Sequence, residues 1–207
     1  MRIINPVIRT YLTILLLTSL LSSQPLHVEK LTISEGLSNS RVHGVMQDSY
    51  GLLWIATNDG LNLYDGYTFK IFKNVPGNPN SIQSNIIWEF TEDLDRNIWI
   101  ATETGVSKYL RDKNIFVNYD LSEQFPGTSG SNARALSVMI DSSNTVWAGT
   151  VGLGAIKFDK TNDKWQLTEL AMDDSSKNKQ GQSALISITM DHHGKIWAGT
   201  FNEGLIC

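Results

Sequence analysis

The sequence predicts an all-β protein built from β-propeller blades of four antiparallel strands, and two observations lead to this prediction. The first is a repeat of four segments that align without gaps, each with an Asp six residues before a Trp and a Thr three residues after it. The second is that short runs rich in Val, Ile, Trp, Phe, Tyr and Thr alternate with turn residues, without a sustained helical period. A group of four short strands that recurs about every 45 residues is typical of propeller blades.

The repeats are centred on four tryptophans at one phase of an apolar strand, namely Trp54, Trp99, Trp147 and Trp197. We expect their rings to fill the space between blades, because large side chains at the same position of successive apolar strands usually pack in a core. A sugar-stacking platform is the alternative. Two places after each Trp stands a small residue that would let neighbouring blades approach closely: Ala56, Ala101, Gly149 and Gly199.

Each of the four aligned segments begins with a tight turn, which the sequence marks with Asp and a residue that tolerates positive φ. In the first copy these residues are Asp48 and Gly51. Asp can accept a hydrogen bond from the backbone two residues on, and Gly adopts positive φ without steric cost. The second copy has Arg96 at the place of Gly51, so we expect its special backbone conformation at Asn97 instead.

Residues 1–23 have the composition of a secretory signal peptide. Two arginines precede an apolar run from Tyr11 to Leu21, and two serines follow it. This run of 11 residues is short for a membrane span, so we expect export to the periplasm or beyond. The single cysteine, Cys207, excludes an intrachain disulfide. The formal charge of −4, without clustered Lys or Arg, argues against nucleic acid as a partner.

The rest of the chain, residues 24–207, is expected to consist of propeller repeats. Their approximate bounds are residues 37–80, 81–126, 127–176 and 177–207. Because the fourth copy stops at Cys207, we expect about three and a half blades of an incomplete propeller, as an N-terminal fragment. In the alternative, Leu26 to Ile33 form the outer strand of the fourth repeat and close a four-bladed ring.

The first repeat resembles a known family. Gly36 to Ser40, the strand–turn–strand segment at residues 42–57 and Tyr64 to Gly66 are similar to the two-component regulator propeller repeat, and the likeness extends over about residues 26–207. This family provides the N-terminal periplasmic sensor region of hybrid two-component system histidine kinases of Bacteroidetes. The resemblance implies a glycan-responsive sensor of seven blades, followed by a β-sandwich, a membrane helix and a kinase, with a homodimer as the full-length form.

The residues offer no catalytic set, so this chain is not expected to be an enzyme. Nothing that resembles a kinase follows the fourth repeat. No histidine among His27, His43, His192 and His193 has zinc-site spacing with Cys or carboxylate partners. Neither a Gly-x-Ser-x-Gly elbow nor a phosphate-binding glycine loop is present. We therefore expect neither a cofactor nor a metal.

Binding is the function that the loops favour. In propellers the innermost strand of each blade lines the channel, and the loops that lead into it surround the channel mouth. Here those loops are rich in side chains that can hydrogen-bond an oligosaccharide, and the candidates are Asn39, Arg41, Asn85, Asn132, Arg134 and Gln182. Two alternatives remain open: a propeller lyase with His43 as its base, and a secreted protein-interaction module.

Overall fold

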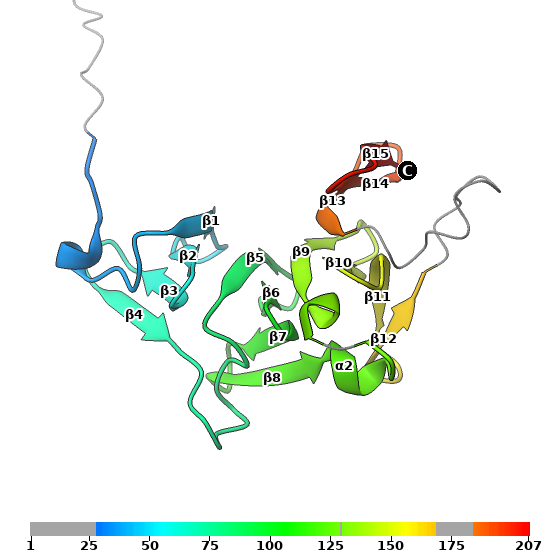
Figure 1. The fold of residues 1–207 in the computed structure, drawn as a ribbon. Coiled ribbons are helices and arrows are strands. Elements are labelled where there is room, and N and C mark those ends of the chain that lie inside the picture. The colour runs from blue at the N-terminus through cyan, green and yellow to red at the C-terminus, as the bar shows by residue number, and fades with distance from the viewer. Residues whose placement is uncertain (1–27, 129, 169–183) are drawn as a thin grey trace, which may run out of the picture. The chain divides into compact units, whose positions relative to one another are not determined.

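The computed structural model describes residues 28–128, 130–168 and 184–207 (Figure 1). The chain divides into two units, Met1–Lys30 and Leu31–Cys207, and every described strand belongs to the second. The predicted signal peptide, residues 1–23, lies outside the described residues. Within the described ranges, no helix has both the length and the apolar character that a membrane span requires.

The strands form separate antiparallel sheets in chain order, as expected for propeller blades (Figure 1). Blade 1 contains β1 (Val42–Gln47), β2 (Leu53–Thr57), β3 (Gly60–Tyr64) and β4 (Phe69–Phe72). Blade 2 contains β5 (Ile87–Glu92), β6 (Ile98–Thr102), β7 (Gly105–Leu110) and β8 (Ile115–Asp120). Blade 3 contains β9 (Ala135–Ile140), β10 (Val146–Thr150), β11 (Ala155–Asp159) and β12 (Lys164–Leu167). Blade 4 contains β13 (Leu185–Met190), β14 (Ile196–Thr200) and β15 (Leu205–Ile206).

The predicted all-β architecture of about three and a half blades is confirmed, whereas the closed four-bladed ring is not found. Residues 28–32 form no strand, and Ile33–Glu35 form the short 3₁₀ helix η1. The three-stranded sheet of blade 4 has the order β13-β14-β15, and among the described strands none pairs with the free edge of β15. Short helices, α2 (Leu121–Gln124) and η2 (Gly130–Ala133), lie in the connection between blades 2 and 3.

The turn between the first two strands of every blade is closed by one Asp carboxylate. In blade 1, Asp48 Oδ1 accepts the backbone N–H groups of Tyr50 and Leu52, both at 2.9 Å. Its other oxygen, Oδ2, accepts Nε1–H of Trp54 at 2.8 Å. The same Asp–Trp bond recurs in blades 2, 3 and 4, at 2.8, 2.9 and 2.8 Å. Asp suits this position because its two oxygens can serve the turn and the ring together.

These hydrogen bonds shift the acidity of the repeat aspartates. Burial acts to raise the pKa of Asp48, but the bonds from Trp54, Arg111 and the turn backbone outweigh burial and leave the pKa below its ordinary value. The pKa of Asp141 is lowered by the same balance. For Asp191 the bond from the Trp197 ring is the largest contribution, and it also lowers the pKa.

The tryptophans pack between blades, as the sequence predicts. Trp54 and Trp99 are fully buried. The Trp54 ring lies 5.6 Å from the ring of Tyr109 in blade 2, and the Trp99 ring lies 4.7 Å from that of Phe158 in blade 3. Trp197, in the last blade, is only half-buried. The blade interfaces therefore form a series, in which Trp54 and Trp99 take equivalent places.

Close approach between blades 3 and 4 depends on Gly149. A Cβ added to Gly149 would lie 2.5 Å from Ser137 Oγ and 3.0 Å from the backbone oxygen of Leu185, which belongs to the next blade. Any larger side chain would push β10 of blade 3 and β13 of blade 4 apart. The expected role of a small residue two places after the Trp is therefore confirmed here.

The expectation that Asn97 takes the positive φ of its turn is wrong. Arg96 itself adopts φ 66°, which matches Gly51 at 82° and Asn144 at 60° in the same turn of other blades. The reason is that the Asp–Trp geometry fixes the turn regardless of the side chain: Arg96 N–H donates to the carbonyl of Asp93 at 2.9 Å, and Asn97 N–H donates to the Asp93 carboxylate at 2.8 Å. The turn therefore imposes a conformation that costs a non-glycine residue about 1 kcal/mol.

Replacing Trp99 with Ala is expected to lower the free energy of unfolding by about 3–5 kcal/mol, because the ring fills a buried space between two blades. The same change at half-buried Trp197 is the control and should cost less than about 2 kcal/mol. Urea unfolding followed by circular dichroism measures both. Equal losses at the two positions would contradict the packing described.

Acid should destabilise the chain through its turn aspartates. A carboxyl whose folded pKa lies below the unfolded value of about 3.9 stabilises the fold above that pH. The contribution is then lost as the pH falls through the folded pKa. Urea midpoints from pH 6 down to pH 2.5 should therefore stay level above about pH 4 and fall below it.

Asp48→Asn tests this assignment. Its amide has one acceptor oxygen, so the buried Trp54 N–H loses its partner and stability at pH 6 should fall by about 1–3 kcal/mol. The variant should also show a shallower loss between pH 4 and pH 2.5 than the wild type. A parallel pH profile in the two proteins would rule out Asp48 as a source of the acid sensitivity.

Candidate functional site

The innermost strands of neighbouring blades lie next to one another, in the order β1, β5, β9 and β13. Each of them carries one β-bulge close to its first residue, where its pairing with the second strand skips a position. The skipped residues are equivalent in the repeat: His43, Trp88, Leu136 and Ile186. A bulge re-aims the side chain of the extra residue and relieves it of ladder hydrogen bonds. Every blade thus presents one such side chain at the same end.

The second strand of each blade ends at this same place with the repeat Thr. The Thr57 hydroxyl donates to the carbonyl of Gly60 at 2.8 Å, and Thr102 and Thr150 bond to Gly105 and Gly154 in the same way. This bond closes the loop into the third strand. The next residue lies just outside the second strand, and it differs in each blade: Asn58, Glu103, Val151 and Phe201.

Five half-buried side chains from three blades meet at this end, and we call them the mouth cluster: His43, Asn58, Trp88, Glu103 and Arg134. His43 Nε2 lies 2.6 Å from Asn58 Oδ1, and its ring centroid lies 4.7 Å from that of Trp88. Trp88 Nε1–H donates to Glu103 Oε2 at 3.2 Å. Arg134 forms an ion pair with the other oxygen of Glu103, and its guanidinium lies 5.7 Å from the Trp88 ring centroid.

The contacts hold the mouth cluster in one arrangement. Glu103 accepts from Trp88 with one oxygen and from Arg134 with the other, so blades 2 and 3 are joined through one carboxylate. The side chains of Glu103 and Arg134 are each 27% exposed, which leaves them accessible from solvent. A preformed, partly wet group of aromatic, amide, imidazole and charged side chains is the kind of surface that binds polar ligands.

A second carboxylate stands beside the cluster on the inner strand of blade 2. Glu89, next to Trp88 in the sequence, accepts the backbone N–H of Val138 in blade 3 at 3.1 Å. Loss of water around the carboxylate raises the pKa of Glu89, and the bond from Val138 offsets only part of this rise. Glu89 therefore links the adjacent inner strands β5 and β9.

Among the residues predicted to bind ligand, Arg134 lies in the mouth cluster. The side chains of Asn39 and Asn85 are engaged within their loops, where Asn39 Oδ1 accepts the N–H of Arg41 at 2.8 Å and Asn85 Oδ1 accepts the N–H of Asn74 at 2.7 Å. They shape the approach to the inner strands. Their part in ligand binding stays a prediction.

The remaining predicted residues are placed differently. Arg41 is exposed at the repeat position of Arg134, and it forms no ion pair within the part of the chain that the structure describes. Asn132 is exposed, and its carbonyl accepts the N–H of Gly152 at 3.1 Å. Gln182 lies outside the described residues. For these three residues too, contact with a ligand stays a prediction.

Sequence reasoning missed Asn58, Trp88 and Glu103. A signal for them was present, because each stands at a fixed distance from a constant residue of the repeat while its own position varies. Asn58 and Glu103 follow the invariant Thr, and Trp88 stands five residues before the invariant Asp of its blade. Variation at a fixed place in a repeat indicates residues that the fold does not require.

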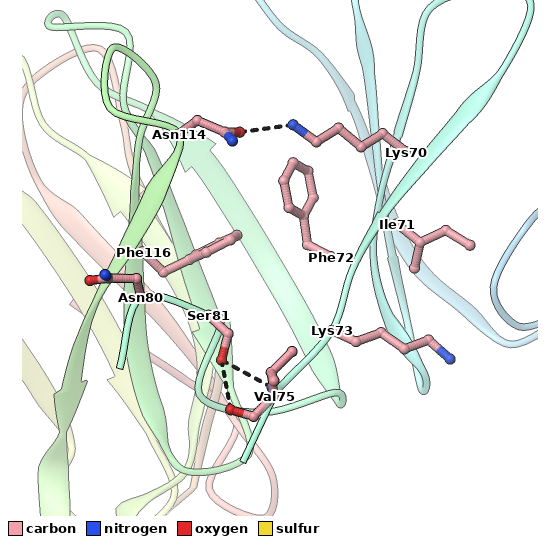
Figure 2. A pocket seen from close by; sticks show the side chains of 9 residues that line it. All are labelled: Lys70, Ile71, Phe72, Lys73, Val75, Asn80, Ser81, Asn114 and Phe116. Atoms are coloured by element: carbon pink, nitrogen blue, oxygen red, sulfur yellow. Dashed lines mark hydrogen bonds between the residues drawn. The ribbon is translucent and has the colours of Figure 1, made fainter. Parts of the chain in front are cut away.

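A separate pocket lies between the outer strands of blades 1 and 2 (Figure 2). It has a volume of about 440 Å³ and lies between β4 and β8. Figure 2 shows Lys70 and Phe72 directed from β4 toward Asn114 and Phe116 of blade 2, with Asn80 and Ser81 from the connecting loop at its border. No sequence argument predicted this pocket.

The four-stranded sheets, their inner-strand order and the mouth at one end define this chain as part of a β-propeller. Residues 36–59 match the family model of the two component regulator propeller. The match covers one repeat, the same one whose residues resemble this family in the sequence.

Similar proteins agree with this assignment. Histidine kinase P4 of Formosa agariphila is 48% identical over 54 residues, which are 26% of this chain and 4% of that protein. Among solved structures, the extracellular domain of the hybrid two component system BT4673 of B. thetaiotaomicron has a TM-score of 0.62 at 22% identity, over 80% of this chain and 20% of that one. A streptogramin B lyase has a TM-score of 0.62 at 16% identity, over 84% of this chain and 52% of the lyase. The structural likenesses show the fold, and the chain spans at most about half of each of these proteins.

Proposed function

We propose that this chain is the ligand-sensing propeller region of an exported two-component sensor, and that an oligosaccharide binds at the mouth cluster. One observation carries the proposal: five half-buried side chains from three blades meet where bulges free a residue of each inner strand. Trp88 offers an aromatic face to a sugar ring. His43, Asn58 and Arg134 offer donors and acceptors to hydroxyl groups.

The comparisons support the signalling role. Two structural neighbours of the chain, from B. thetaiotaomicron, are extracellular domains of hybrid two component systems. The relative from Formosa agariphila is a histidine kinase. The signal-peptide composition of residues 1–23 supports export. Because the chain covers only 20% of the BT4673 domain, we further propose that its blades belong to a longer sensor.

A ligand at the mouth would act on the contacts between blades. The Trp88–Glu103–Arg134 contacts cross from blade 2 to blade 3, and the His43–Trp88 contact crosses from blade 1 to blade 2. A ligand that binds better to one arrangement of these side chains shifts the protein toward that arrangement, by no more than its difference in affinity. The signal would therefore begin as a change in side-chain contacts at the blade boundaries.

Calorimetric titration with a panel of oligosaccharides tests the proposal. We expect saturable binding by at least one of them, and Trp88→Ala should weaken it at least about tenfold, which corresponds to about 1.4 kcal/mol of lost contact energy. His192→Ala is the control, because His192 is exposed in the turn at the opposite end of its blade. Unchanged affinity in folded Trp88→Ala would refute the mouth site, and absence of binding by every oligosaccharide would refute the sensing role.

A lyase is the second candidate, because His43 stands on an inner strand with its Nε2 directed at Asn58 and a streptogramin B lyase shares the fold. A lyase requires a base that removes a proton from the substrate. Turnover of a cyclic peptide or polysaccharide that is lost in His43→Ala would favour this class. Binding without turnover would favour the sensor, whereas saturable binding of a protein but of no glycan would favour an interaction module.

A further inference from the structure

The pocket between β4 and β8 has a counterpart one interface along the propeller. The strand register makes the two places equivalent: Phe72 pairs with Leu61 as Tyr119 pairs with Val106. In the same way Phe116 pairs with Tyr109 and Trp165 pairs with Phe158. The space between β8 and β12 therefore shows what normally occupies this part of a blade interface.

Between β8 and β12 the space is filled by the protein itself. Leu121 of α2 is fully buried there, and Trp165 is 4% exposed. Val117 packs against the same cluster. The outer part of the interface between blades 2 and 3 thus contains the side chains of Leu121, Trp165 and Val117.

Between β4 and β8 each of these three positions holds a different kind of residue. Counting along the equivalent strands, Asn74 stands for Leu121, Phe116 for Trp165 and Lys70 for Val117. The Asn74 side chain turns to the carbonyl of Ile82, to which it donates at 2.9 Å. Asn74 does not line the pocket, and Ile82 of the connecting loop is the fully buried aliphatic side chain of this interface. At the pocket itself, the two interfaces therefore differ by Phe in place of Trp and by Lys in place of Val.

The charge at this place differs as well. Asn114 takes the position of Asp163, and both adopt φ 53° in the same turn. Lys70 Nζ lies 2.8 Å from Asn114 Oδ1 and 4.7 Å from the centroid of the Phe72 ring. Among the described residues Lys70 has no carboxylate within ion-pair distance, whereas Lys73 is paired with Asp59. The pocket thus combines an aromatic wall with one ammonium group that lacks a counter-charge.

The walls of the pocket are held in place. Phe116 N–H donates to the carbonyl of Asn80 at 3.0 Å, just as Trp165 N–H donates to Gln124 Oε1 at 3.1 Å in the filled interface. The Ser81 hydroxyl donates to the carbonyl of Asn78 at 2.9 Å, and the N–H of Val75 donates to that hydroxyl at 3.0 Å. A pocket whose border is already hydrogen-bonded loses little freedom when it binds.

We propose that this pocket is a binding site for a small amphipathic anion, whose compact apolar body lies against Phe72 and Phe116 and whose carboxylate or sulfate pairs with Lys70. Such a ligand fills space that the larger Trp165 ring takes up in the next interface, and it supplies the acid that Asn114 does not. The site is independent of the mouth cluster, because it lies on the outer strands.

Protein-observed NMR titration of the full chain tests the site with phenylacetate as probe and benzyl alcohol as its neutral counterpart. Phenylacetate should bind with a dissociation constant on the order of 1 mM, as expected for a ligand of this size, and shift the Asn114 side-chain amide signals. Lys70→Gln should weaken the binding of phenylacetate by about fivefold, in the range for one exposed ion pair. The affinity for benzyl alcohol should stay unchanged. Lys164→Gln, which removes an exposed lysine on β12, is the matched control.

A filled variant separates the pocket from charge effects elsewhere. Phe116→Trp places the larger ring of the next interface in the wall of the pocket, so it should abolish binding of both probes and leave the melting temperature equal or higher. Wild-type binding that persists in this folded variant, equal affinity in Lys70→Gln, or no shift with either probe would each overturn the proposal. Binding of an acidic extended peptide to the β4 edge, but of neither probe, would also overturn it in favour of a protein partner.

Discussion

The bond between the repeat Asp and the repeat Trp is the interaction on which the rest of the structure depends. One carboxylate holds the turn through its Oδ1 and fixes the indole ring through its Oδ2. The ring is thereby placed between its own blade and the next, where it forms the centre of the interface. Local hydrogen bonding and packing between blades are thus set by the same two side chains. A propeller of short strands needs such coupling, because a single four-stranded sheet has little core of its own.

The order of the blades follows from this coupling. Trp54 and Trp99 are fully buried because the aromatic strands of the next blade cover them. Close approach of the second strand of blade 3 to the inner strand of blade 4 then requires a small residue, Gly149. The inner strands consequently lie side by side, and the bulges near their first residues come together at one end. Packing between the blades, rather than any single loop, therefore brings the residues of the mouth cluster together.

Much of the fold was predictable from the sequence, whereas the sites were less so. The Asp-to-Trp spacing indicates both the turn and the packed ring, since both depend on residues within one repeat. The positive φ of Arg96 was missed because a residue preference was followed where the hydrogen bonds of Asp93 decide the conformation. The roles of Trp88 and Glu103 depend on register and on contacts across blades, which no single repeat contains. The outer pocket becomes visible only when two interfaces are compared in space.

The bulge near the start of each inner strand has a consequence for how such proteins can change over time. His43, Trp88, Leu136 and Ile186 carry neither the ladder hydrogen bonds nor the turn of their blades. Mutation at one of these positions therefore leaves the ladder and the turn of its blade intact, and its effect falls on contacts at the mouth, such as that between His43 and Trp88. A duplicated repeat of this kind provides one variable residue position per blade. Ligand recognition can therefore diverge between related proteins while the scaffold stays the same.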